Sequence, residues 1–81
     1  MTEQEIRAAM REFVGRFVRG HELADGDDIF ATGYVNSMFA MQLVQFVEQA
    51  FGITCESEDL EIDNFRSIDA LTAFVRRKQS A

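Results

Sequence analysis

The sequence predicts an all-α domain, a small bundle of three main helices with one short helix in the second long loop. Three observations support this prediction. Apolar residues recur at three- and four-residue spacing in three segments, no proline interrupts them, and no segment alternates apolar and polar residues as a strand does. The chain has 81 residues, of which 47% are apolar, so we expect residues 1–81 to form a single domain around one core.

Residues 2–18 fit the first helix. Thr2 and Glu5 have the spacing of a capping box, in which each side chain bonds the backbone N–H of the other residue. One apolar stripe follows the cap and consists of Ile6, Met10, Phe13, Val14, Phe17 and Val18. We expect Gly20 to end this helix, because glycine adopts the left-handed conformation of a helix C-terminus without strain.

A long acidic connection over residues 20–36 leads to the second helix. Ile29 and Phe30 are an adjacent pair of large apolar residues within it, and we expect them to hold it against the helices. Its acidic run 25–28 is not an EF-hand loop. If Asp25 were the first ligand, Phe30 would stand at the sixth position, where that loop needs glycine.

Residues 37–51 fit a second helix with more apolar residues than one core face needs. We expect its buried stripe to consist of Met38, Met41, Val44 (with Leu43), Val47 and Phe51 (with Ala50). Phe39 and Phe46 are seven residues apart and therefore share a second face. That face is either buried as well or forms, with Gln42, an exposed surface for a partner; periodicity alone favours burial.

A second connection follows, and the last helix begins near residue 68. We expect one short helical turn within residues 60–65, and Ser67 as the cap of the last helix. The core stripe of that helix consists of Ile68, Leu71, Phe74 and Val75.

Charge and composition exclude several classes of function. Residues 20–65 carry ten acidic residues and no Lys or Arg, which disfavours nucleic-acid binding. His21 and Cys55 are the only residues of their kinds, and neither has the partners of a catalytic or metal site. The sequence has no signal peptide and no apolar run long enough to cross a membrane, so we expect a cytoplasmic protein.

Ser37 stands at the start of the second helix, after a glycine turn at Gly33 and next to Asn36. The free N–H groups and the dipole of a helix N-terminus favour an anion there. The run Gly-x-x-Asn-Ser-Met, with Asp28-Ile29-Phe30 upstream, resembles the Gly-x-Asp-Ser-Leu signature of acyl and peptidyl carrier proteins. The resemblance extends along the whole chain.

This resemblance implies a protein that is not an enzyme. Ser37 would carry 4′-phosphopantetheine, flanked by Asn36 and Met38, after transfer from coenzyme A by a phosphopantetheinyl transferase that uses Mg²⁺. In carrier proteins the second helix is the usual docking surface, which favours the exposed interpretation of Phe39, Gln42 and Phe46. The expected partners are acyl-loading, acyl-modifying and acyltransferase or synthase enzymes. We expect a free-standing monomer that binds neither nucleic acid nor membranes and holds no metal.

Two departures from the family narrow the function. Asn36 replaces the usual aspartate, and Glu48 is the only acidic residue of the second helix. Both argue for secondary metabolism, in polyketide or mixed polyketide and nonribosomal peptide (antibiotic) biosynthesis. Residues 33–48 resemble most the discrete carriers that form hydroxymalonyl or methoxymalonyl extender units. The alternatives are an aminoacyl carrier (peptidyl or D-alanyl) and a helical adaptor that binds partners through Phe39 and Phe46 without any prosthetic group.

Overall fold

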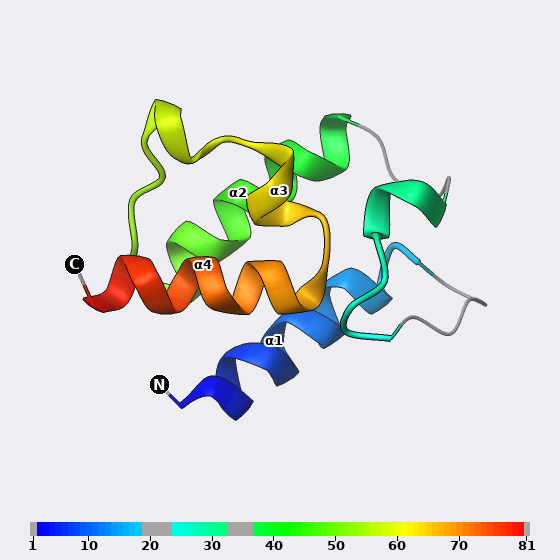
Figure 1. Ribbon diagram of the computed structural model, residues 1–81, viewed down its shortest axis with the longest axis horizontal. Coiled ribbons are helices and arrows are strands. Elements are labelled where there is room, and N and C mark those ends of the chain that lie inside the picture. Colours follow the sequence, from blue (N-terminus) through cyan, green and yellow to red (C-terminus); the bar gives the residue numbers. More distant parts are fainter. Residues whose placement is uncertain (1, 19–23, 33–36, 81) are drawn as a thin grey trace.

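The computed structural model describes residues 2–18, 24–32 and 37–80. Its elements, in chain order, are α1 (Glu3–Gly15), the 3₁₀ helix η1 (Ile29–Thr32), α2 (Ser37–Phe51), the 3₁₀ helix η2 (Ser57–Asp59), α3 (Ile62–Phe65) and α4 (Ile68–Ser80) (Figure 1). These residues include no strand. The predicted all-α bundle, with three long helices and a short one in the second connection, is confirmed.

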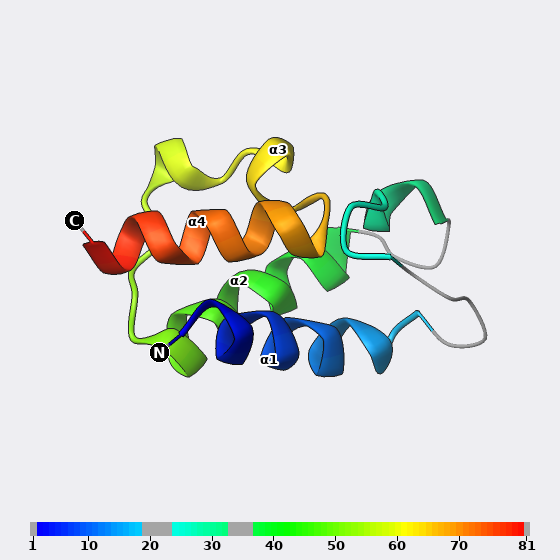
Figure 2. The same cartoon turned by 60° about the horizontal axis from the view of Figure 1, so that its bottom comes forward.

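The helices α1 and α4 lie against each other and run in opposite directions, with α2 packed beside them (Figures 1 and 2). Their fully buried side chains include Ile6, Met10 and Val14 from α1 and Leu71 and Val75 from α4. The α1 set recurs every four residues, and Ile68 and Phe74 are buried with the α4 set, so each helix presents one apolar stripe to the core. The core stripe predicted for the last helix is therefore confirmed.

The ends of the helices follow the predicted capping chemistry. The Glu5 N–H donates to Thr2 Oγ1 at 3.2 Å, and the Thr2 N–H donates to Glu5 Oε1 at 2.8 Å, which completes the capping box. The Ala70 N–H donates to Ser67 Oγ at 3.0 Å at the start of α4. Gly52, with φ of 65°, follows the last residue of α2 in the left-handed conformation.

Helix α1 is shorter than predicted. It ends at Gly15, and the next three residues form a turn in which the Phe17 and Val18 N–H groups both donate to Val14 O at 3.0 Å. Val18 nevertheless remains in the core, at 5% exposure, so the apolar stripe continues beyond the regular helix. Gly20, the predicted end of this helix, lies outside the described residues.

The prediction of which face of α2 is buried was right for Leu43, Val47 and Phe51 and wrong for its two methionines. Met38 and Met41, expected in the core, are each 67% exposed. The buried residues of the helix are Phe39, Leu43, Val47 and Phe51, which recur every four residues. Leu43, Val47 and Phe51 belong to both candidate stripes. The stripe that contains Phe39 in place of the methionines is the buried one, because a phenyl ring removes more apolar area from water than a thioether chain does.

Candidate functional site

Ser37 is the first residue of α2, and it is exposed to solvent. The backbone N–H groups of a helix's first turn have no partner within the helix, and their dipoles make the surroundings electropositive. The Ser37 hydroxyl is therefore accessible to a modifying enzyme, at a place where a phosphate ester is electrostatically favoured. Asn36, the predicted neighbour in this site, lies outside the described residues.

The face of α2 that begins at Ser37 is exposed and carries no charged side chain up to Gln45. Met41 lies one turn after Ser37, and Gln45 one turn after Met41. Met38 and Gln42 are exposed beside them. The side chains that surround the serine on this helix are therefore thioethers and amides, which suit apolar contacts and neutral hydrogen bonds.

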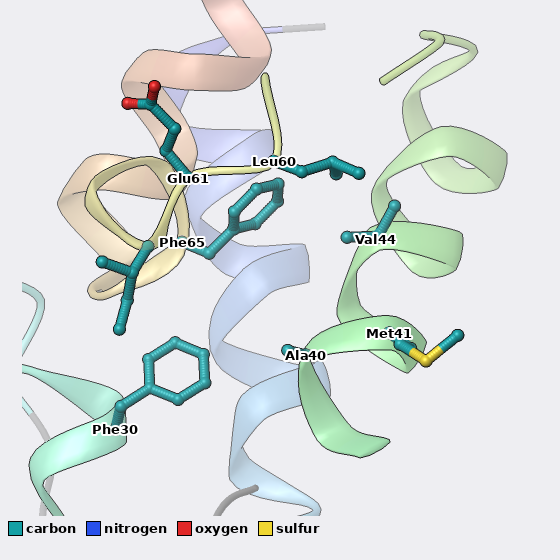
Figure 3. A pocket seen from close by; sticks show the side chains of 8 residues that line it. Phe30, Ala40, Met41, Val44, Leu60, Glu61 and Phe65 are labelled. Atoms are coloured by element: carbon teal, nitrogen blue, oxygen red, sulfur yellow. The ribbon is translucent and has the colours of Figure 1, made fainter. Parts of the chain in front are cut away.

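An apolar groove lies next to this face, between α2 and the segment that contains α3 (Figure 3). Its cavity volume is about 300 Å³, and it is lined by Phe30, Ala40, Met41, Val44, Leu60, Glu61, Ile62 and Phe65. Leu60 extends toward Val44 across the groove, whereas the carboxylate of Glu61 points away from it (Figure 3). The groove is thus almost entirely hydrocarbon and begins one helical turn from Ser37.

Two exposed side chains extend the apolar surface of this groove beyond α2. Leu60 is 54% exposed and Ile62 is 55% exposed, both from the connection that ends in α3. The sequence analysis placed them only in a loop with a helical turn and assigned them no role. Two large apolar residues within an otherwise acidic loop were the signal that could have identified them.

Of the three residues predicted to form an exposed partner surface, only Gln42 is exposed. Gln42 is exposed as expected. Phe39, however, is buried at 4% exposure, so the exposed interpretation of this residue was wrong. Phe46 is half-buried, and its ring stacks on Phe13 with the centroids 4.3 Å apart.

The reason for this difference lies in α1. Its Phe13 and Phe17 rings contact Phe39, with centroid distances of 6.1 and 4.9 Å, and so cover the face that the predicted surface would have used. A cluster of aromatic rings between two helices is more stable than the same rings in water. The adaptor hypothesis loses its basis, because it required Phe39 at the surface.

Among the described residues, the other candidate reactive group, the Cys55 thiol, has no surroundings that would activate it. The Cys55 N–H donates to Glu48 Oε2 at 2.9 Å, and burial, reinforced by the charge of Glu48, raises the pKa of the Cys55 thiol. The thiol is therefore protonated and unreactive at neutral pH. No cluster of metal-ligating side chains occurs within residues 2–18, 24–32 and 37–80, and no helix there is long and apolar enough to cross a bilayer. His21 lies outside these ranges.

Residues 4–75 match the family model described as "Phosphopantetheine attachment site". No curated protein and no solved structure matches the chain. Domains of this family carry covalently attached 4′-phosphopantetheine, are modified by a phosphopantetheinyl transferase, interact with partner enzymes, and are not catalytic themselves. The match covers most of the chain, including both helices that flank the groove and the start of α2, and the chain therefore belongs to this family of phosphopantetheine-carrying domains.

Proposed function

We propose that the protein is an acyl carrier protein of secondary metabolism and that Ser37 is its attachment site. The observation that supports this most directly is the exposed hydroxyl at the first residue of α2, in a chain of the phosphopantetheine-attachment family. Ser67, by contrast, is 7% exposed, and its hydroxyl caps α4.

The residues present fit the group. A phosphodiester at the N-terminus of α2 gains about 0.3–1 kcal/mol from the helix dipole, and the helix gives it a rigid base. The transferase joins the Ser37 oxygen to the pantetheine-bearing phosphorus of coenzyme A. The phosphoanhydride bond breaks, adenosine 3′,5′-bisphosphate leaves, and the serine proton passes to a base of the transferase. The attached group supplies a thiol that holds the cargo as a thioester.

Mass spectrometry tests the attachment. The purified protein is incubated with coenzyme A, Mg²⁺ and a transferase of broad specificity, and its intact mass is measured. We expect one phosphopantetheine per chain, and peptide fragmentation is expected to assign it to Ser37. A chain that stays unmodified, or that is modified at Ser57 or Ser80, would contradict the proposal.

The groove would favour a long hydrocarbon acyl cargo over an aminoacyl cargo. Its lining consists of hydrocarbon and thioether groups, apart from Glu61, whose carboxylate points away. Each methylene that leaves water for such a surface gains about 0.8 kcal/mol, whereas an ammonium group loses hydration there.

A stability measurement distinguishes these cargoes. Because a group that binds only the folded state stabilises it, an octanoyl thioester is expected to raise the urea midpoint of the loaded protein. An alanyl thioester on the same arm is expected to give the same urea midpoint as the protein whose arm carries no cargo. Equal midpoints for the octanoyl and alanyl forms would show that the groove does not select the cargo.

The pathway proposal rests on the likeness of residues 33–48 to carriers of hydroxymalonyl and methoxymalonyl extender units. A unit so short and polar gains little from the groove, which then remains available to a partner. Neighbouring genes for glyceryl transfer and dehydrogenation would support this pathway. A neighbouring adenylating ligase would instead indicate an aminoacyl cargo.

The docking surface that we propose consists of Met38, Met41, Gln42 and Gln45. It replaces the predicted surface of Phe39, Gln42 and Phe46, from which only Gln42 is kept. Flexible thioethers adapt to different partner surfaces, and neighbouring amides supply hydrogen bonds without a desolvated charge. We infer a partner surface that is apolar at its centre, because the exposed apolar residues of α2 adjoin the groove.

Met41→Glu tests this surface. A carboxylate in the middle of an apolar contact is expected to raise the KM of the transferase for the protein by about tenfold, equivalent to about 1.4 kcal/mol. Ala50→Glu is the matched control, since Ala50 is also exposed on α2 but lies near its opposite end. Equal effects of the two substitutions would indicate a response to net charge and contradict the docking surface.

A further inference from the structure

Residues 24–32 form one wall of the groove beside Ser37. Phe30, in η1, lines the groove, and its ring lies edge-on to Phe39 with the centroids 6.2 Å apart. Ile29 beside it is fully buried, which confirms that this pair holds the connection against the helices. Thr32, the last residue of η1, precedes Ser37 by only five positions. The placement of this segment therefore determines part of the surface that an enzyme approaching Ser37 contacts.

Two backbone hydrogen bonds attach the segment to the part of the chain that leads into α4. The Ile29 N–H donates to Arg66 O at 2.6 Å, and the Asp69 N–H donates to Asp25 O at 2.9 Å. Between these points the segment has no regular helix, although Asp28 Oδ1 accepts from the Phe30 N–H at 2.9 Å and so caps η1. Its position depends on contacts with α4 and α1.

The contact with α1 is made by Arg7, Arg11, Asp25 and Asp69, which we call the Arg7 cluster; within α1, Glu3 Oε2 also accepts from Arg7 Nη2 at 3.2 Å. Arg7 Nη1 donates to Asp25 Oδ2 at 2.8 Å and also to Asp69 Oδ1. Arg11 Nε donates to the other oxygen of Asp25, Oδ1, at 2.7 Å. Arg7 thus joins α1, the segment and the first turn of α4 through one planar guanidinium.

The carboxylate of Asp25 is more enclosed than a surface acid. Its side chain is 17% exposed, and both of its oxygens are occupied by guanidinium groups. Bonding to Arg11 and to Arg7 lowers the pKa of Asp25, so the group is fully charged at neutral pH. Removing Arg7 would leave this charge partly buried with one partner fewer, which disfavours the observed position of the segment.

We propose that Arg7 is a positioning residue for the modification of Ser37. Through Asp25 and Asp69 it keeps residues 24–32, and with them Phe30, in the arrangement that the transferase binds. This inference rests on the proposed attachment of phosphopantetheine at Ser37. It assigns to a residue of α1, outside the groove and the exposed face of α2, an influence on how the enzyme recognises the protein.

Arg7→Met, which removes the charge and keeps a long side chain, tests the proposal. If the arrangement that binds is populated to about one fifth in this variant, the KM of the transferase for the protein rises about fivefold while kcat is unchanged. Amide hydrogen exchange at Ile29 and Asp69 is expected to accelerate in the same variant, because both N–H groups bond across this junction.

Arg76→Met is the matched control. Arg76 Nη1 donates to Glu3 Oε1 at 2.6 Å and so also joins α4 to α1, as Arg7 does. Its bonded partner, Glu3, lies on α1 and not in residues 24–32, although the other oxygen of Glu3 accepts from Arg7 at 3.2 Å. We expect an unchanged KM and unchanged exchange at Ile29 and Asp69. An equal rise in KM for both variants would mean that any loss of contact between α1 and α4 suffices, and would overturn the proposal.

Asp25→Asn examines the same contact from the segment and keeps the size of the side chain. It is expected to raise KM by a similar factor. The double variant with Arg7→Met is expected to have a smaller effect than the two single effects combined, because both changes remove the Arg7–Asp25 ion pair, although Arg7 also bonds Asp69 and Asp25 also bonds Arg11. Wild-type KM in both single variants would refute the role of Arg7 while leaving Ser37 as the attachment site. An unmodified wild-type protein would instead refute the proposed function.

Discussion

Ser37→Ala is expected to abolish attachment of phosphopantetheine completely. The phosphodiester needs the serine oxygen, and alanine offers no atom to which the phosphorus could bond. The fold is expected to remain intact, because Ser37 is exposed and its side chain fills no part of the core. Intact-mass measurement after incubation with coenzyme A and transferase gives the result directly, and circular dichroism confirms that the variant is folded.

Ser57→Ala is the control for this experiment. Ser57 is exposed and begins the 3₁₀ helix η2, so it shares with Ser37 an accessible hydroxyl at the start of a helical element. Unlike Ser37, it does not begin a long helix, and it is not on the exposed face of α2 that includes Met41 and Gln42. We expect Ser57→Ala to be modified as fast as the wild type. If the Ser37→Ala variant were modified at all, however slowly, Ser37 would not be the attachment site.

The elements of the fold could be predicted because local sequence determines them. The capping box of Thr2 and Glu5 and the cap at Ser67 each depend on residues within one turn. The sequence could not determine which face of α2 is buried. Two apolar stripes compete on that helix, and the choice depends on Phe13 and Phe17, which belong to a different helix.

The candidate site could likewise be predicted only where it depends on local sequence. Ser37 could be proposed because a short motif and the start of a helix coincide there. The groove could not, because its lining comes from η1, α2 and the segment ending in α3, which meet only in three dimensions. The resemblance to carrier proteins correctly suggested an exposed face on α2, but transferring it to Phe39 placed that face on the wrong side of the helix.

The assignment of faces on α2 makes a strong prediction for stability. Phe39→Ala is expected to cost about 3–5 kcal/mol, because it removes a ring that is 4% exposed and packs against the rings of Phe13, Phe17 and Phe30. A domain of this size has a total stability of about 4–12 kcal/mol, so the loss is a large fraction of it and exhausts it at the lower end of that range. Urea unfolding followed by circular dichroism measures the loss.

Met41→Ala is the matched substitution on the same helix. Met41 is 67% exposed, and we expect its truncation to change the free energy of unfolding by no more than about 0.5 kcal/mol. The order of the two variants decides which stripe of α2 is buried. If Met41→Ala were the more destabilising, α2 would be rotated from the position described here. The docking surface on Met38 and Met41 would then be buried, and Phe39 would regain its place as a candidate for partner binding.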